Sequence, residues 1–350
     1  MQNIARLSDQ MEIKMNKKRL GLLLGQVVVI IILSGCSGGG DKVKEENKPT
    51  RVVNVPRFNA DSAYAFVKKQ VDFGPRVPNS QAHKETGDFL VNKLKEYGAT
   101  VVTQEFTAPS YHGQQLQLRN IIGSYGGEKQ KRILLAAHWD TRPFADKDPD
   151  NPTGPMDGAN DGASGVGVLL EMARQLDRDT TIQVGVDIIF FDGEDWGEPE
   201  TDQGQRKPPG DWDSWWCMGS QYWSRNKHKS NYSAYYGVLL DMVGAKKSQF
   251  FREGASLQYA PNIVAKVWDT GARLGYSDYF VKQNAHAITD DHIYVNEWGK
   301  IPMIDIVHYQ QGIGYFGDYH HSQKDNMDLI SKETLEAVGA TLLNVIYYEE

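Results

Sequence analysis

The stretch Ile133-Leu134-Leu135-Ala136-Ala137-His138-Trp139-Asp140 is an apolar run that ends directly in a histidine and an aspartate. Apolar runs of this length with β-branched residues indicate strands that are buried in a mostly parallel sheet. Two further runs follow the same pattern, because residues 184–191 are followed by Glu194-Asp195 and residues 235–240 by Asp241. Ligands of open α/β sheets bind beyond the carboxyl ends of the strands, so we expect these side chains to converge in one crevice.

Strand-like and helix-like segments alternate along most of the chain. We expect strands at residues 100–106, 116–124, 131–138, 182–191, 235–242 and 302–307, with a turn at residues 125–128 joining the second to the third. We expect helices at residues 60–71, 80–97, 165–176, 217–226, 261–274 and 332–348. This alternation predicts a three-layer α/β fold with a central, mostly parallel sheet flanked by helices.

The composition is that of a soluble globular protein and excludes some function classes. Of 350 residues, 40% are hydrophobic and 24% are charged, which is ordinary for a soluble fold. The net charge of −7 argues against a nucleic-acid partner. The chain has only two cysteines, so it carries no disulfide framework.

The first residues have the features of a targeting signal. A basic stretch at residues 14–19 precedes an apolar stretch at residues 20–33 that is short for a membrane span. Leu33-Ser34-Gly35-Cys36 resembles the bacterial lipobox, which implies cleavage before Cys36 and a lipid on its thiol. The alternatives are a plain secretory peptide or an uncleaved anchor. We therefore expect a signal peptide at residues 1–36, a flexible tether at 37–56 and one globular domain at 57–350, anchored in the bacterial envelope and facing the periplasm.

The carboxylates and histidines that follow the strands are of the types that bind zinc with an open coordination position. Asp161 lies in Gly158-Ala159-Asn160-Asp161-Gly162-Ala163-Ser164-Gly165, where small residues allow a tight turn, and it either binds a metal or caps the following helix. Glu194 and Asp195 are adjacent and point to different sides, so one can hold a metal while the other faces a substrate. Taken alone, this pair would be interpreted as two solvated acids on a loop, and it is the full order of the motifs that argues against that interpretation.

A long, tryptophan-rich segment separates Phe191 from the helix near Met218. Loops of this length inside a compact domain are usually functional or disordered, and the tryptophans argue against disorder. We expect the segment to form an aromatic wall of the site, although it could also be a packed surface excursion. The candidate substrate-binding residues there and near the carboxyl end are Trp196, Trp215, Trp216, Phe316 and Tyr319.

The order of the motifs resembles the zinc aminopeptidase superfamily from about Arg57 to the carboxyl end. The motifs are His138-x-Asp140, Asn160-Asp161-Gly162-Ala163-Ser164-Gly165, Phe190-Phe191-Asp192-Gly193-Glu194-Asp195, Leu239-Leu240-Asp241-Met242-Val243-Gly244 and His321-Ser322-x-x-Asp325. Within it, Asp290-Asp291-His292 followed by Ile301-Pro302-Met303-Ile304-Asp305-Ile306 resembles the glutaminyl cyclase branch. The resemblance implies a central mixed sheet flanked by helices, one zinc per chain, and conversion of an N-terminal glutaminyl residue to pyroglutamate with release of ammonia.

The resemblance also implies a role for each matching residue. Asp161, Asp195 and His321 match zinc ligands, Glu194 matches the general acid/base, and Asp241 and Asp291 match the two acids that complete the catalytic network. His138 and Asp140 match the remnant of a second metal site that cyclases leave empty. Two departures are that Asp195 replaces the glutamate of many relatives, and that His320 stands where animal enzymes carry tryptophan, so that spacing alone favours His321.

The expected partners are peptides or proteins that begin with glutamine, and the expected state is a monomer. One alternative is a two-zinc aminopeptidase in which His138, Asp161 and Asp241 complete a second metal site; Asp290-Asp291-His292 favours the cyclase. A catalytically inactive binding lipoprotein is a second alternative, but every expected chemical group is present.

Overall fold

The computed structural model of the protein describes residues 53–179, 181–309 and 316–350. Cys36, the signal at residues 1–36 and most of the tether lie outside the described residues. Among the residues that are described, no helix has the length and apolarity needed to cross a membrane.

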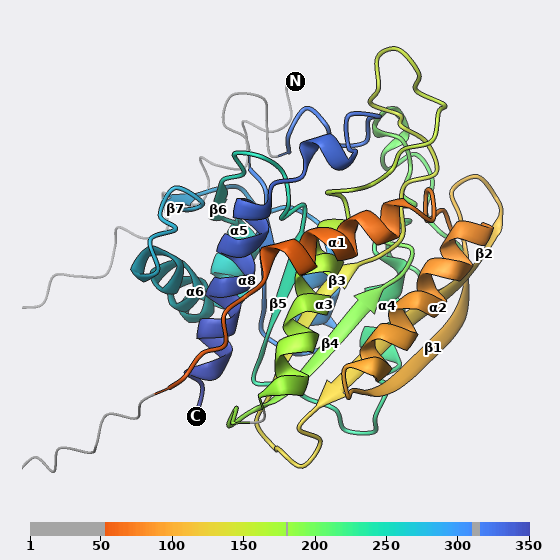
Figure 1. The fold of residues 1–350 in the computed structure, drawn as a ribbon. Coiled ribbons are helices and arrows are strands. Elements are labelled where there is room, and N and C mark those ends of the chain that lie inside the picture. Colours follow the sequence, from red (N-terminus) through yellow and green to blue (C-terminus); the bar gives the residue numbers. More distant parts are fainter. Residues whose placement is uncertain (1–52, 180, 310–315) are drawn as a thin grey trace, which may run out of the picture. The chain divides into compact units, whose positions relative to one another are not determined.

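A six-stranded mixed sheet forms the centre of the domain (Figure 1). Its order is β1-β2-β4-β3-β5-β8, in which β1 and β2 run antiparallel to their neighbours and the other four strands are mutually parallel. The bounds are β1 Thr100–Pro109, β2 Gln115–Tyr125, β3 Arg132–His138, β4 Gly185–Phe191, β5 Tyr236–Asp241 and β8 Met303–Val307. The predicted fold class, a mostly parallel sheet between helices, is confirmed.

The parallel strands are buried on both faces, as their continuous apolar runs predict. Alternate side chains of β3 enter two different cores: Ile133, Leu135 and Ala137 belong to one, and Leu134 and Ala136 to the other. The register pairs His138 with Phe191 and Asp241 with Val307, so β3, β4, β5 and β8 all end at one edge of the sheet.

Helices cover both faces of the sheet. Figure 1 shows α1 (Ala60–Val71), α2 (Gln81–Glu96), α3 (Ala163–Arg178) and α8 (Lys332–Tyr347) in front of the strands and α4 (Met218–Arg225) behind them. The helix α6 (Pro261–Arg273) packs on α8, and α7 (Asp291–Glu297) packs beside α4. Serine side chains cap the first turns of α2 and α8. Ser80 accepts a hydrogen bond from the His83 amide, and Ser331 accepts one from the Thr334 amide.

Several short elements were not predicted from the sequence. They are β6 (Phe250–Arg252) and β7 (Phe280–Asn284), which pair with each other in a small separate sheet, α5 (Gly254–Tyr259), α7, and the 3₁₀ turns η2 (Glu200–Asp202) and η3 (Met327–Leu329). The turn after β2 also does not make β2 and β3 neighbours. The strand β4 lies between them, because it pairs antiparallel with β2 and parallel with β3.

Candidate active site

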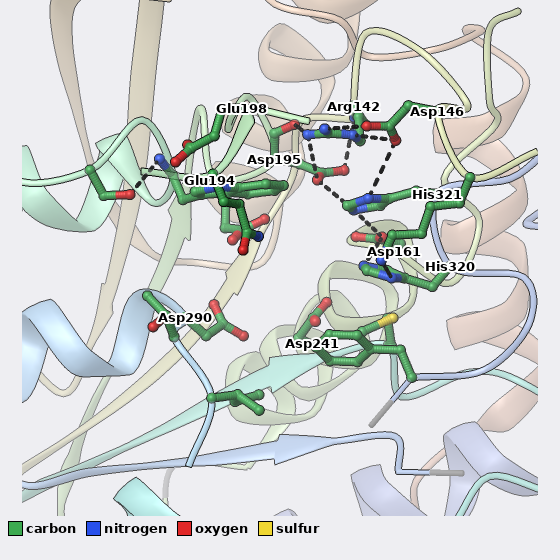
Figure 2. A pocket seen from close by; sticks show the side chains of 18 of the residues that line it. Arg142, Asp146, Asp161, Glu194, Asp195, Glu198, Asp241, Asp290, His320 and His321 are labelled. Atoms are coloured by element: carbon green, nitrogen blue, oxygen red, sulfur yellow. Dashed lines mark hydrogen bonds and ion pairs between the residues drawn. The ribbon is translucent and has the colours of Figure 1, made fainter. Parts of the chain in front are cut away.

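A cavity of about 550 Å³ opens at the edge where the parallel strands end. Acidic residues and two histidines from distant parts of the chain meet there (Figure 2). The residues that line it are Arg142, Asp146, Lys147, Asp161, Glu194, Asp195, Glu198, Gln203, Gly204, Ser214, Trp216, Asp241, Met242, Ala287, Ile288, Thr289, Asp290, Phe316, His320 and His321. The predicted crevice beyond the strand ends is therefore present.

Asp161, Asp195 and His321 lie together on one side of this cavity (Figure 2). His321 Nε2 is 2.9 Å from Asp195 Oδ1 and 3.8 Å from Asp161 Oδ2. Asp161 Oδ2 is buried and has no hydrogen-bond partner among the described residues. His321 Nε2 thus faces one carboxylate oxygen of each aspartate, and one imidazole nitrogen with two carboxylates is a set of ligand types that fits a zinc ion with a position left open.

His320 lies beside His321, with their ring centroids 3.6 Å apart, but it points differently. Its Nε2 atom is 4.0 Å from Asp161 Oδ2, and its Nδ1 atom accepts a hydrogen bond from Lys147 Nζ at 3.0 Å. Asp161, His320 and His321 form a group whose ligand atoms lie within 4.8 Å of one another. His321 is nevertheless the histidine whose Nε2 atom makes the short contact to Asp195.

Two buried aspartates hold the backbone of the candidate ligands. Asp325 accepts hydrogen bonds from the Asn160 amide at 2.7 Å and the Asp161 amide at 3.0 Å. Asp140 accepts from the Glu194 amide at 3.1 Å and the Asp195 amide at 3.2 Å. Asp140 does not line the cavity; it acts on the site by fixing the turn after β4.

A glycine brings α3 close enough to the sheet to place Asp161. A Cβ atom on Gly165 would lie 2.4 Å from the Leu240 carbonyl oxygen and 2.9 Å from Ala137 Cβ. A larger residue would push the helix away from β3 and β5, and with it the turn that carries Asp161.

Glu194 faces the cavity from the turn after β4. Cys217 Sγ donates to Glu194 Oε1 at 3.3 Å, and the Cys217 amide donates to the Glu194 carbonyl oxygen at 2.9 Å. Burial raises the pKa of the Glu194 carboxyl well above its ordinary value, and the nearby acids Asp290 and Asp195 raise it further. A carboxyl group of raised pKa can both accept and return a proton near neutral pH.

Asp241 and Asp290 face the same cavity as Glu194, and a carboxylate oxygen of Asp290 lies within 4.8 Å of one of Glu194 (Figure 2). Burial is the main reason that the pKa of Asp241 is raised to about 7. The sequence predicted Asp291 as the second acid, but Asp290 lines the cavity and Asp291 does not. The reason is local: Asp290 is the N-cap of α7 and stays outside the helix, whereas Asp291 is fully buried in its first turn.

His138 connects the two halves of the site. Its Nε2 atom is 3.1 Å from Asp161 Oδ1 and 3.2 Å from Asp241 Oδ1, and these three residues form a second converging group. Burial alone would lower the pKa of His138, but hydrogen bonds to Asp140, Asp161 and Asp241 raise it well above its ordinary value. In turn, although burial would raise the pKa of Asp161, the hydrogen bond and charge of His138 lower it.

Only part of the predicted aromatic wall faces the cavity. Trp216 and Phe316 line it. Trp196 and Trp215 pack instead into a separate apolar cluster with Phe106, Leu118 and Met218. Tyr319 is buried beside Val307 and contacts His308 Nδ1 through its hydroxyl at 2.5 Å. These three side chains do not line the cavity and pack into apolar clusters.

Some of the lining residues were missed by the sequence analysis. Arg142, Asp146 and Lys147 come from the connection after β3, which contains no predicted element. Glu198 comes from the tryptophan-rich loop. The N-cap preference for aspartate before a short helix is the signal that would have separated Asp290 from Asp291.

The chain is similar in sequence and in fold to several known proteins. The sequence profile of peptidase family M28 matches residues 120–346. A glutaminyl cyclase from Bacteroides thetaiotaomicron, solved bound to N-acetylhistamine, is 49% identical with a TM-score of 0.81, covering 85% of this chain and 100% of that one. A glutaminyl cyclase from Tannerella forsythia is 48% identical with a TM-score of 0.80, covering 84% and 100%. A Zn-dependent exopeptidase from Parabacteroides distasonis is 51% identical with a TM-score of 0.80, covering 85% and 100%.

Proposed function

This chain belongs to peptidase family M28, and within that family we propose that it is a zinc-dependent glutaminyl-peptide cyclotransferase. It converts the N-terminal glutamine of peptides and proteins to pyroglutamate and releases ammonia. The observation that carries the proposal is that Glu194, Asp241 and Asp290 face the same cavity as Asp161, Asp195 and His321. The similarity to two bacterial glutaminyl cyclases supports the same function.

Asp161, Asp195 and His321 would hold one zinc ion. Bound there, zinc supplies Lewis-acid polarisation of the substrate's γ-carbonyl oxygen. Asp241 and Asp290 then remain available to the substrate's amine.

The reaction needs proton transfer but no water. The α-amino nitrogen of the substrate forms a bond to the γ-carboxamide carbon, and the bond from that carbon to its nitrogen breaks. Glu194 accepts the proton that the attacking amine loses and returns it to the departing nitrogen, which leaves as ammonia. The thiol of Cys217 and the backbone bonds to Asp140 orient Glu194 for both transfers.

Asp241 and Asp290 bind the amine end of the substrate. Both are almost fully buried, with exposed fractions of 7% and 5%, so an amine that enters the cavity exchanges water for carboxylate oxygens. Trp216 and Phe316 supply apolar wall against which a folded glutamine side chain can pack.

The competing function is a two-zinc aminopeptidase, and one observation favours it. His138, Asp161 and Asp241 converge closely enough to hold a second ion. In that arrangement Asp241 would be occupied by metal and unavailable to a substrate amine. The two functions therefore differ in metal stoichiometry and in product.

The deciding experiment compares a peptide that begins with glutamine and one that begins with leucine, with products followed by mass spectrometry and bound zinc measured on the same preparation. Loss of ammonia from the glutamine peptide, an unchanged leucine peptide and one zinc per chain are expected. Removal of leucine together with two zinc ions per chain would establish the aminopeptidase instead.

We further propose that the mature chain is a monomeric lipoprotein, anchored through Cys36 and facing the periplasm. The lipobox-like Leu33-Ser34-Gly35-Cys36 supports this location. The full chain expressed in a Gram-negative host should incorporate labelled palmitate and partition into detergent, whereas Cys36→Ser should do neither. Equal labelling of both proteins would exclude the anchor, and light scattering of the soluble domain tests the monomer.

A further inference from the structure

The part of the connection at residues 142–147, soon after β3, contacts two of the candidate zinc ligands, Asp195 and His321. Arg142 and Asp146 form a bidentate pair within it, with Arg142 Nε donating to Asp146 Oδ1 at 2.8 Å and Nη2 donating to Oδ2 at 2.5 Å. The Arg142 side chain is only 4% exposed. A buried arginine with both edges of its guanidinium in use is a rigid element.

The first contact of this pair is with Asp195. The Arg142 amide donates to Asp195 Oδ2 at 2.9 Å, and Arg142 Nη1 donates to the Asp195 carbonyl oxygen at 3.2 Å. The loop thus holds one carboxylate oxygen of Asp195 and its backbone. The other oxygen, Oδ1, is the atom that lies 2.9 Å from His321 Nε2.

The second contact is with His321. Asp146 Oδ1 lies 3.6 Å from His321 Nδ1, on the side of the ring away from the two ligand carboxylates. The Lys147 amide donates to the His321 carbonyl oxygen at 3.0 Å. A carboxylate that faces Nδ1 favours a proton on that nitrogen and leaves the Nε2 lone pair for a metal.

Trp216 packs against both partners. Its ring is parallel to that of His321 within 6° at a centroid distance of 5.9 Å, and the Arg142 guanidinium carbon lies 4.7 Å from the ring centroid. Gly197 permits this position, because a Cβ atom there would lie 1.7 Å from Trp216 Cε2. Arg142 also donates to the Gly197 carbonyl oxygen at 3.2 Å.

We propose that Arg142 and Asp146 form a clasp that fixes the orientation of two zinc ligands, Asp195 and His321, and thereby sets the affinity of the site for zinc. Both are positioning residues, because they act through their contacts to Asp195 and His321 (Figure 2). The inference rests on the proposed function only in taking zinc as the metal. Without the clasp both ligand side chains lose a partner and have to be ordered by the ion itself, which weakens binding.

The test compares Asp146→Asn with Asp150→Asn in the full soluble domain. Asp150 is an exposed residue of the same connection, so the control makes the same change of charge. The dissociation constant for zinc is measured by competition with a chromophoric chelator, and the thermal midpoint of each metal-free protein is measured alongside. Asp146→Asn should weaken zinc binding about 10–100-fold, with the control within twofold of the parent.

A second variant and a spectroscopic readout keep the test decisive. Arg142→Lys keeps the charge but loses the bidentate fork, so it should also weaken zinc binding, and cobalt-substituted Asp146→Asn should show a shifted d–d spectrum. Parent-like affinities and an unchanged cobalt spectrum in both variants would overturn the clasp. Cyclisation by the parent is assayed on the same preparation, so a parent that binds zinc without cyclising glutamine fails the proposed function and leaves the clasp standing.

Discussion

Cys217 and Glu194 are joined by two hydrogen bonds, one from the Cys217 amide to the Glu194 carbonyl oxygen at 2.9 Å and one from its thiol to Oε1 at 3.3 Å. The pairing joins the start of α4 to the turn after β4. It fixes both the backbone and the carboxyl of the residue assigned to proton transfer.

Cys217→Ala removes the thiol donor and leaves the backbone bond. The net value of one such bond is about 1 kcal/mol, so turnover of a glutamine peptide should fall about fivefold. Cys217→Ser restores a donor and should recover most of this loss at an unchanged KM. Equal rates for the alanine variant and the parent would show that the thiol does not orient Glu194.

Glu194→Gln keeps the size of the side chain and removes its ability to accept a proton. Turnover should fall by about 10²–10⁴-fold, while zinc content and thermal midpoint stay near those of the parent. Steady-state kinetics with metal analysis of the same sample measures this. Near-normal turnover would refute the acid/base assignment.

Asp290→Asn and Asp291→Asn separate two neighbours that the sequence does not distinguish. Asp290 lines the cavity, so its amide variant should lower turnover by about 100-fold or more. Asp291 is fully buried in the first turn of α7 and does not line the cavity, so asparagine, which has a similar shape, should replace it with a loss of less than about tenfold. The reverse ranking of the two variants would assign the role to Asp291.

Asp161→Ala should lose zinc, since this carboxylate belongs to the proposed ligand set. For the parent protein, we compare the free energy of unfolding with chelator and with free zinc at about a thousand times its dissociation constant. The chelated protein should be less stable by about 4 kcal/mol. Thermal melts with and without chelator measure the difference, which should be nearly absent in the variant. If the variant keeps its full zinc content, Asp161 is not a zinc ligand and the proposed ligand set is wrong.

Glu253 makes the stability of the domain depend on acid pH. Burial would raise its pKa, but the hydrogen bond and charge of His292 and the amides of Ala255 and Ser256 outweigh burial and lower the pKa from 4.5 to about 2. The stabilisation is complete above pH 4.5 and is lost as the pH falls toward 2, because only the unfolded chain binds the proton in that interval. The loss amounts to at most about 3 kcal/mol.

Urea unfolding of metal-free protein between pH 6 and 3 checks this, with chelator present so that zinc release does not contribute. Glu253→Gln should flatten the pH dependence, whereas Glu128→Gln, at a side chain that is 72% exposed, should leave it unchanged. The same slope in the Glu253 variant and the parent would assign the acid sensitivity elsewhere.

The long elements were predictable because local patterns determine them. The helix at residues 60–71 and the strand ends at His138 and Asp241 follow from periodicity and burial. The position of β4 between β2 and β3 was not predictable, because it depends on pairing between distant segments. The candidate zinc ligands were assigned through the resemblance in motif order to a known family. Such a resemblance implies which distant residues lie together in the fold, whereas the spacing of residues along this one sequence does not.

The missed parts of the site depend on packing. A tryptophan in a loop can face a substrate or anchor the loop, and the sequence does not distinguish Trp216 in the cavity from Trp215 in an apolar cluster. Arg142 and Asp146 act through two ligands that come from distant parts of the chain, so no local pattern identifies them.

The apolar cluster that holds Trp196 and Trp215 is separate from the two cores of the sheet. The loop at residues 197–214 is therefore flanked by two tryptophans that pack in this separate cluster. The acidic residues of the cavity, in contrast, lie at the ends of strands and the starts of helices. Gly197 contacts Arg142 and Trp216, but Gln203 and Gly204 line the cavity further along the loop, and we expect changes there to alter which peptides reach the cavity. Selection for new substrates and selection for turnover would then act on different stretches of one chain. The loop is therefore the segment in which substitutions are best suited to change the substrate specificity.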